Sequence, residues 1–200
     1  MNKKIILGSS SEYRKTLLQS LGVSFECHSP NIDETPLYQE CATDLVERLS
    51  IAKAFAVHHD RQQKGLVEDT AIITSDQVAT LHGNILGKPH TEENAIKQLT
   101  TFSGEKVTFL TGLCVFDQHT QTYQYSLNEY YVYFRDLSPR EIQQYISIEQ
   151  PLDCAGSFKC EGLGVCLFEK MEGNDPNSLI GLPLISLCRQ LRELGINPIG

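Results

Sequence analysis

Positive charge and long apolar runs are both scarce in this chain. Its 17 lysines and arginines stand against 25 aspartates and glutamates, which gives a formal net charge of −8. Phosphate repulsion opposes general nucleic-acid binding by such a chain, although a small phosphate ligand is not excluded. Near the start, Ile5–Leu7 is followed by polar residues and is too short for a signal-peptide core or a membrane span. We therefore expect a cytoplasmic protein that binds neither nucleic acid nor membranes.

Close cysteine pairs are also missing. Seven cysteines are scattered through the sequence, and none belongs to a CxxC motif. An odd number of scattered cysteines fits reduced, packed thiols better than a disulfide framework. Cys154, Cys160 and Cys166 recur every six residues, but no nearby histidine or CxxC pair completes a zinc ligand set. The sequence thus predicts free thiols.

The bulk composition is that of an ordinary globular domain. A hydrophobic fraction of 40%, a charged fraction of 21% and a mean hydropathy of −0.23 exclude a disordered or membrane-embedded chain. A chain of 200 residues can bury about two-thirds of its unfolded surface without a disulfide or metal staple. We expect residues 1–200 to form a single domain, either undivided or in two lobes.

Helices and strands are predicted to alternate in the first half of the chain. Apolar periodicity and capping signals predict strands at 3–7 and 71–75 and helices at 12–21, 44–58 and 91–101. Ser9 and Glu12 have the spacing of a capping box for the first helix. In the second helix, Lys53 falls at the edge of an apolar stripe made of Leu45, Leu49, Ala52 and Ala56.

Strands dominate the second half. The predicted elements are a hairpin turn at 82–84, antiparallel strands at 106–116 and 123–134, a helix starting at 138, a strand near 165–170 and, after a loop, a terminal helix at 183–195. Ser138, Pro139 and Glu141 supply every signal for a helix start. Early alternation followed by clustered strands indicates an α/β fold with a mixed sheet.

Two glycine-containing stretches are candidates for phosphate binding. The sequence GSSSEYR, residues 8–14, combines small side chains, free backbone N–H groups, a helix N-terminus and Arg14. Serine loops also precede helices for structural reasons alone, so both interpretations stay open. Residues 83–89, GNILGKP, do not form a Walker loop, because the glycine spacing is one residue short and Pro89 stands where Ser or Thr would hold magnesium.

Asp76 is the strongest candidate for chemistry. It follows apolar residues at the predicted carboxyl end of a strand, where ligands bind in open α/β sheets. A partly buried acid there is costly unless it is paired or metal-bound, which favours a functional role. Glu34 lies in NIDETP, where a solvated acidic turn is the alternative.

Three lysines could complete such a site or simply be solvated on the surface. They are Lys53, Lys88 and Lys159. If they converged with Arg14 near the two acids, cationic clamps would stand beside carboxylates able to hold a divalent metal on a polyphosphate.

With these residues in view, the chain resembles the Maf family of nucleotide pyrophosphatases, and more closely its 7-methyl-GTP pyrophosphatase branch. The resemblance rests on segments that occur in the family's order: ILGSSSEYRKTLL, PNIDETP, RLSIAKA, TSDQV, ILGKP, FSGEKVTFLTGL, CAGSFKCEGLG and GNDPNSLIGLPL. It implies an elongated α/β fold around a mixed sheet with a cleft between two lobes, related to that of inosine triphosphate pyrophosphatases.

The same resemblance implies roles for individual residues. Asp76 corresponds to the catalytic carboxylate, a proton acceptor or metal-linked base. Glu34, Lys53 and Lys88 correspond to the other acid and lysines of the cleft, and Ser9 and Arg14 to its phosphate-binding loop. The implied reaction cleaves a nucleoside triphosphate between the α and β phosphates with Mg²⁺ or Mn²⁺, for which Glu34 and Asp76 are the expected ligands. A homodimer is a plausible assembly by the same resemblance.

Tyr13, Gln77 and Glu161 resemble the residues that select the base in this branch. Methylation at N7 gives guanine a delocalised positive charge, which Tyr13 can stack against through cation–π attraction. Glu161 can accept hydrogen bonds from N1–H and the 2-amino group, and Gln77 can supply an amide contact. Without the resemblance, packing or surface duty would be preferred for all three.

Three other functions compete with this hypothesis. The first is the branch of the same family that cleaves dTTP and UTP, which Gln77 and Glu161 disfavour. The second is a non-catalytic nucleotide-binding regulator of cell division, which has no need of a base beside the phosphates. The third, a haloacid-dehalogenase-type phosphatase, is disfavoured because SDQVA lacks the second aspartate of DxDxT.

Overall fold

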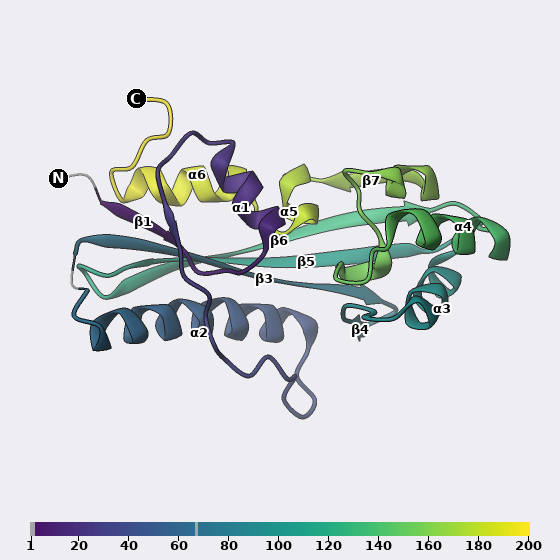
Figure 1. Cartoon of the computed structure of the whole chain (residues 1–200), viewed down its shortest axis with the longest axis horizontal. Helices are drawn as coiled ribbons and strands as arrows, with labels where there is room; N and C mark the ends of the chain where they lie inside the picture. The colour runs from purple at the N-terminus through teal and green to yellow at the C-terminus, as the bar shows by residue number, and fades with distance from the viewer. Residues whose placement is uncertain (1–2, 67) are drawn as a thin grey trace.

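A mixed sheet of seven strands runs through the molecule (Figure 1). The computed structural model describes residues 3–66 and 68–200. The strands are β1 (Lys4–Leu7), β2 (Glu26–Cys27), β3 (Thr70–Leu81), β4 (Asn84–Leu86), β5 (Lys106–Asp117), β6 (Thr122–Phe134) and β7 (Phe168–Gly173). Their order is β2-β1-β3-β5-β6-β7, and β4 pairs with β3. The β1 strand is parallel to β2 and β3, and all other pairs are antiparallel. The predicted α/β class with a mixed sheet is confirmed.

Helices cover both faces of the sheet and one end of it (Figure 1). They are α1 (Glu12–Gln19), α2 (Ala42–Gln63), α3 (Glu92–Phe102), α4 (Pro139–Glu149), α5 (Pro176–Ile180) and α6 (Leu184–Glu193), with 3₁₀ turns at Ala155–Ser157 and Leu163–Leu167. The predicted capping box at the start of α4 is present, with Pro139 in its first turn. The division of a single domain into two lobes stays a prediction. None of the helices in the described ranges is long and apolar enough to cross a membrane.

Alternation along the central strands assigns each residue to one face. Ile6 and Ile72 pack under α2 with Val57, whereas Leu7 and Ile73 pack against α6. Successive side chains of a strand point to opposite faces. Further along β3, the even-numbered residues therefore face α2 and the odd-numbered residues face the side of α5 and α6.

The prediction that a strand ends at residue 75 is wrong. The β3 strand continues to Leu81, so Asp76 lies in its middle. β1 stops opposite Ile73, and β4 begins to pair only at Ala79, while β5 pairs with β3 throughout. Because β5 continues to pair with β3 there, the polar residues of β3 keep an extended conformation. Residues 74–78 are thus open on one side, between the end of β1 and the start of β4.

Three local predictions also need correction. Ser11, not Ser9, caps α1, because its Oγ accepts a hydrogen bond from the Arg14 backbone N–H at 3.4 Å. The buried stripe of α2 includes Lys53 itself, which long-range pairing draws inward. The segment expected to be a loop before the last helix contains α5, capped by Asp175. An Asp-Pro pair is a helix-start signal, so the sequence did contain evidence for α5.

Candidate active site

A cavity of about 410 Å³ opens beside the unpaired stretch of β3. Its lining comes from the end of β1, the start of α1 and the loop before α2, and includes Ser9, Arg14, Glu34, Lys53, Asp76 and Lys88. Tyr13 and Gln77 line it too, so eight of the predicted site residues, far apart in the sequence, meet in one place.

The serine loop comes directly after β1, and its first residue packs closely against β3. Gly8 allows this approach, because a Cβ at position 8 would lie only 2.5 Å from the Thr74 methyl group. Ser9 is buried, and its Oγ accepts a hydrogen bond from the Ser11 backbone N–H at 3.1 Å. The loop therefore presents the N-terminus of α1 to the cavity, a place that favours anions.

Lys53 joins the two acids. Its Nζ lies 2.6 Å from Asp76 Oδ1 and 3.0 Å from Glu34 Oε1. Lys53 and Asp76 are both buried, whereas the Glu34 side chain is 58% exposed. The other Asp76 oxygen makes no hydrogen bond with residues in the described ranges. It is the oxygen left free to accept a proton or to meet a cation.

Gly112 allows this contact to form. It lies opposite Asp76 on β5, and a Cβ there would come within 2.6 Å of Ser50 Oγ and 2.8 Å of the Val46 carbonyl oxygen in α2. Without a side chain at that point, α2 approaches the sheet closely enough for Lys53 to reach Asp76.

Arg14 is held by the far end of α5. Its Nε donates a hydrogen bond to the Gly181 carbonyl oxygen at 2.9 Å. Ser75 Oγ lies 2.9 Å from the same oxygen and 2.7 Å from the Gly112 backbone oxygen, so its one hydrogen is shared between them and β3 and α1 both contact α5 at one point. Burial lowers the pKa of Arg14, and the charges of Asp76 and Glu34 act in the opposite direction. A guanidinium stays protonated under all ordinary conditions, so Arg14 offers a fixed positive charge.

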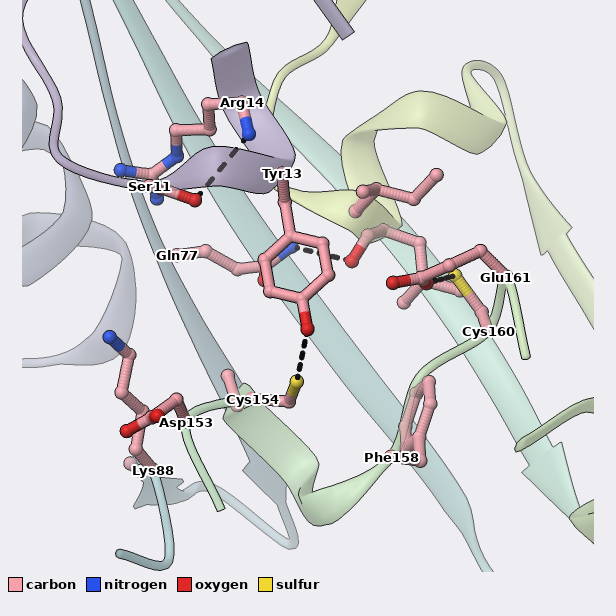
Figure 2. Close-up of a pocket in the computed structure, with 14 residues that line it drawn as sticks. Ser11, Tyr13, Arg14, Gln77, Lys88, Asp153, Cys154, Phe158, Cys160 and Glu161 are labelled. Atoms are coloured by element: carbon pink, nitrogen blue, oxygen red, sulfur yellow. Dashed lines mark hydrogen bonds between the residues drawn. The ribbon is translucent and has the colours of Figure 1, made fainter. Parts of the chain in front are cut away.

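A second cavity of about 140 Å³ adjoins the first and collects the three predicted base-selecting residues (Figure 2). Tyr13, Gln77 and Glu161 line it, together with Cys154, Phe158 and Cys160. The two cavities share six lining residues, namely Ser11, Tyr13, Arg14, Gln77, Lys88 and Asp153. One ligand could therefore extend through both.

The groups around the second cavity are held in defined states. Burial, followed by a hydrogen bond with Cys154, raises the pKa of Tyr13, so its ring carries a neutral hydroxyl. Burial and the charge of Glu161 raise the pKa of Cys160 to about 12, which keeps this thiol protonated. The cavity thus combines a neutral aromatic ring with the acid of Glu161, a pairing suited to a cationic ring system.

Comparison with known proteins identifies the family. The family model for Maf-like proteins matches residues 4–194. The chain belongs to the Maf family. It is 49% identical to a 7-methyl-GTP pyrophosphatase of Colwellia psychrerythraea, over 98% of this chain and 94% of that protein. It is 51% identical to one of Hydrogenovibrio crunogenus, over 96% and 94%. Among solved structures, the Staphylococcus aureus Ham1 protein matches with a TM-score of 0.48 and 14% identity, over 81% of this chain and 90% of that one.

Lys159 is the one candidate lysine of this Maf protein that does not join the site. Its Nζ donates to the Glu149 backbone oxygen at 2.6 Å and lies 3.8 Å from the Glu149 carboxylate. Lys88 does line both cavities, on the exposed loop after β4. The seven cysteines are free, as predicted.

Sequence reasoning missed several lining residues of this Maf protein. They include Asp153, Cys154, Phe158, Leu179 and Ile180. The first three lie in or beside CAGSFKCEGLG, a segment that the resemblance had already marked. The last two lie on α5, whose Asp-Pro start was the available signal.

The donor set for a divalent cation in this Maf protein is small but suitable. Within residues 3–66 and 68–200, no cluster of three or more His, Cys, Asp or Glu side chains is placed to hold a metal ion. The carboxylates of Asp76 and Glu34 nevertheless converge on one point, since a single ammonium contacts both. Mg²⁺ typically takes one or two carboxylates and completes its shell with water and substrate phosphates. The two acids fit that pattern.

Proposed function

We propose that this Maf protein hydrolyses 7-methyl-GTP to 7-methyl-GMP and pyrophosphate, and so removes a modified nucleotide from the pool. The observation that carries the proposal is the junction of the two cavities. One is lined by cations, acids and a helix N-terminus, and the other by an aromatic ring, an amide and an acid. The names of the relatives, which span nearly the whole chain, support the same substrate.

The larger cavity would hold the triphosphate. The serine loop of Ser9 and the first turn of α1 offer backbone N–H groups to phosphate oxygens. Arg14 and Lys88 would offset the negative charge that develops on the departing pyrophosphate. A triphosphate bound in this way would have its anhydride bond next to Asp76.

Asp76 would act as the proton acceptor. A water molecule attacks the α-phosphorus, its proton passes to the free Asp76 oxygen, and the bond to the bridging oxygen breaks so that pyrophosphate leaves with that oxygen. The Asp76–Lys53 contact of 2.6 Å fixes the carboxylate in place before the reaction.

A divalent cation, Mg²⁺ or Mn²⁺, would bind at Asp76 and Glu34. When bound, it would supply positive charge to the phosphate oxygens and make a nearby water easier to deprotonate. Glu34, on its exposed loop, keeps the freedom to turn from Lys53 toward such a cation.

The smaller cavity would hold the base. The Tyr13 ring can stack on the positively charged 7-methylguanine, and Glu161 can accept its hydrogen bonds and balance its charge. The same acid repels the carbonyl edge of thymine or uracil, so the proposal includes rejection of dTTP and UTP.

Pyrophosphate release tests the proposal directly. It is measured from 7-methyl-GTP, GTP, dTTP and UTP with Mg²⁺ or Mn²⁺, using the wild type and Asp76→Ala, with Lys159→Met as a matched control outside the cavities. We expect selective cleavage of 7-methyl-GTP that the Asp76 variant loses and the Lys159 variant keeps.

The other outcomes separate the alternatives. A preference for dTTP or UTP would keep the family and reject the substrate. Nucleotide binding without turnover would favour the regulator of cell division. The proposed cytoplasmic location and homodimer are checked separately, by fractionation and by the mass of the protein in solution.

A further inference from the structure

The amide group of Gln77, which lines the smaller cavity, is held by several hydrogen bonds. Its Nε2 has two hydrogens to donate among three acceptors: the Ser178 backbone oxygen at 2.7 Å, the Leu179 backbone oxygen at 3.1 Å and Thr111 Oγ1 at 2.9 Å. Figure 2 shows this nitrogen directed toward the backbone of α5, behind the ring of Tyr13. Of these partners, Thr111 and Ser178 lie outside the lining of the cavity, and Leu179 belongs to it.

The donors and acceptors around Gln77 determine the orientation of its amide group. The two backbone oxygens can only accept hydrogen bonds. The single hydroxyl hydrogen of Thr111 is already donated to the Ser178 oxygen at 2.9 Å, so Thr111 offers Gln77 a lone pair. Reversing the amide would set its oxygen against three acceptors. The amide nitrogen must therefore point to α5 and the amide oxygen to the cavity.

Thr111 is well placed to enforce this orientation. It lies directly opposite Gln77 in the β3–β5 register, so the two side chains share a face of the sheet. Thr111 is fully buried, which makes an unmatched hydrogen-bonding group there costly. Its hydroxyl also links α5 to the sheet, since it bonds to Ser178 as well as to Gln77.

We propose that Thr111 is a positioning residue for substrate selection: it locks Gln77 so that only the amide oxygen faces the base, where it accepts a hydrogen bond from the 2-amino group of the purine. This inference rests on the proposed function, and it specifies how the base is read. The amino group has two hydrogens, which allows Glu161 to take one and Gln77 the other.

The chemical consequence is selection against purines that lack the 2-amino group. A purine without the 2-amino group leaves the Gln77 oxygen without a partner once water is excluded. Sites built to bond a substrate N–H discriminate strongly against analogues that lack it, because their own polar group is left unpaired. An amide free to rotate would instead adapt to either kind of base and would lose this discrimination.

The test compares Thr111→Val, which has nearly the same shape without the hydroxyl, with Thr111→Ser, which keeps it. For each protein, kcat and KM are measured with 7-methyl-GTP and with 7-methyl-inosine triphosphate, which lacks the 2-amino group. In parallel, ¹⁵N NMR follows hydrogen exchange of the Gln77 side-chain amide in the free protein.

We expect the wild type to prefer 7-methyl-GTP, and Thr111→Val to reduce that preference roughly tenfold through KM, about the effect of one hydrogen bond. Thr111→Ser should restore it. The Gln77 amide hydrogens should exchange slowly in the wild type and in Thr111→Ser, and faster in Thr111→Val.

Two results would overturn the inference. One is fast exchange of the Gln77 amide in the wild type, which would show that the lock does not exist even if no variant folds well. The other is an unchanged preference in a folded Thr111→Val protein. Failure of the proposed function looks different, because 7-methyl-GTP would not be cleaved at all. Thr111 would then have no role in substrate selection, but the exchange of the Gln77 amide hydrogens would still show whether Thr111 holds that amide in place.

Discussion

At the scale of single residues, the site depends on sharing one cation between two acids. Lys53 is buried, and its ammonium contacts both Asp76 and Glu34. Removing one carboxylate leaves the ammonium paired with the other, whereas removing the ammonium leaves two carboxylates facing each other. The two kinds of substitution should therefore affect stability and activity in different proportions.

We predict that Asp76→Asn lowers the rate of pyrophosphate release by at least roughly 100-fold, because the proposed proton acceptor is lost. Its free energy of unfolding should change by less than roughly 2 kcal/mol, since Glu34 still pairs with Lys53. Lys53→Met should cost more, roughly 3 kcal/mol, because a buried charge loses its partner. Urea denaturation and the pyrophosphate assay measure both quantities. A larger loss of stability in Asp76→Asn than in Lys53→Met would contradict this account.

At the scale of elements, an ion pair with Arg48 of α2 holds the segment that carries Glu34. Arg48 Nε donates to Glu40 Oε1 at 2.6 Å, and Arg48 Nη2 donates to Glu40 Oε2 at 2.8 Å and to the Thr35 backbone oxygen at 3.2 Å. Glu40 also accepts a hydrogen bond from the Leu37 backbone N–H. A bidentate contact of this kind fixes direction as well as distance. The segment before α2 is thus held where Glu34 can reach Lys53.

The Arg48–Glu40 ion pair should weaken in acid. The hydrogen bonds from Arg48 are the main cause that lowers the pKa of Glu40 from 4.5 to about 2. A carboxylate with a depressed pKa in the folded state stabilises the protein above its unfolded pKa, and this stabilisation is lost as the pH falls through the folded value. The free energy of unfolding of the wild type should therefore fall more steeply between pH 4.5 and pH 2 than that of Glu40→Gln. Chemical denaturation at several pH values checks this, and parallel curves would refute it.

At the scale of the whole molecule, the site forms where the sheet is incomplete. The end of β1, the start of β4 and the uninterrupted pairing of β3 with β5 leave residues 74–78 open on one edge. Alternation along β3 then sends Asp76 toward α2 and Gln77 toward α5. The proposed catalytic residue and one of the proposed base-selecting residues are thus neighbours on one strand.

The same architecture predicts a gradient of hydrogen exchange. The β5 strand pairs along its length with both β3 and β6, whereas β2 is a two-residue edge strand and β7 is the opposite edge. Amides bonded within the core open only with large-scale unfolding, and edges open locally. Exchange measured by mass spectrometry should be slowest in β5 and fastest in β2 and β7. Nucleotide should add protection at the first turn of α1, and equal exchange in β5 and β7 would be inconsistent with this structure.

The sequence by itself determined the types of residue in the site and most of the local elements. The helix start at Ser138 and the antiparallel pair of long strands follow from signals within a few residues, and the structure contains both. Local signals succeed because capping, turns and alternation depend on neighbours in the chain.

Only the tertiary structure decided how these residues work together. The position of Asp76 in mid-strand, the inward turn of Lys53 and the lock on Gln77 each depend on partners far away in the sequence: β5 and α2 for the first two, and Thr111 and Ser178 for the third. Pairing with β5 overrides the local break that polar residues suggest, and a buried ion pair overrides the expected exposure of a lysine. Such energies arise only once the chain has folded, so no local pattern carries them.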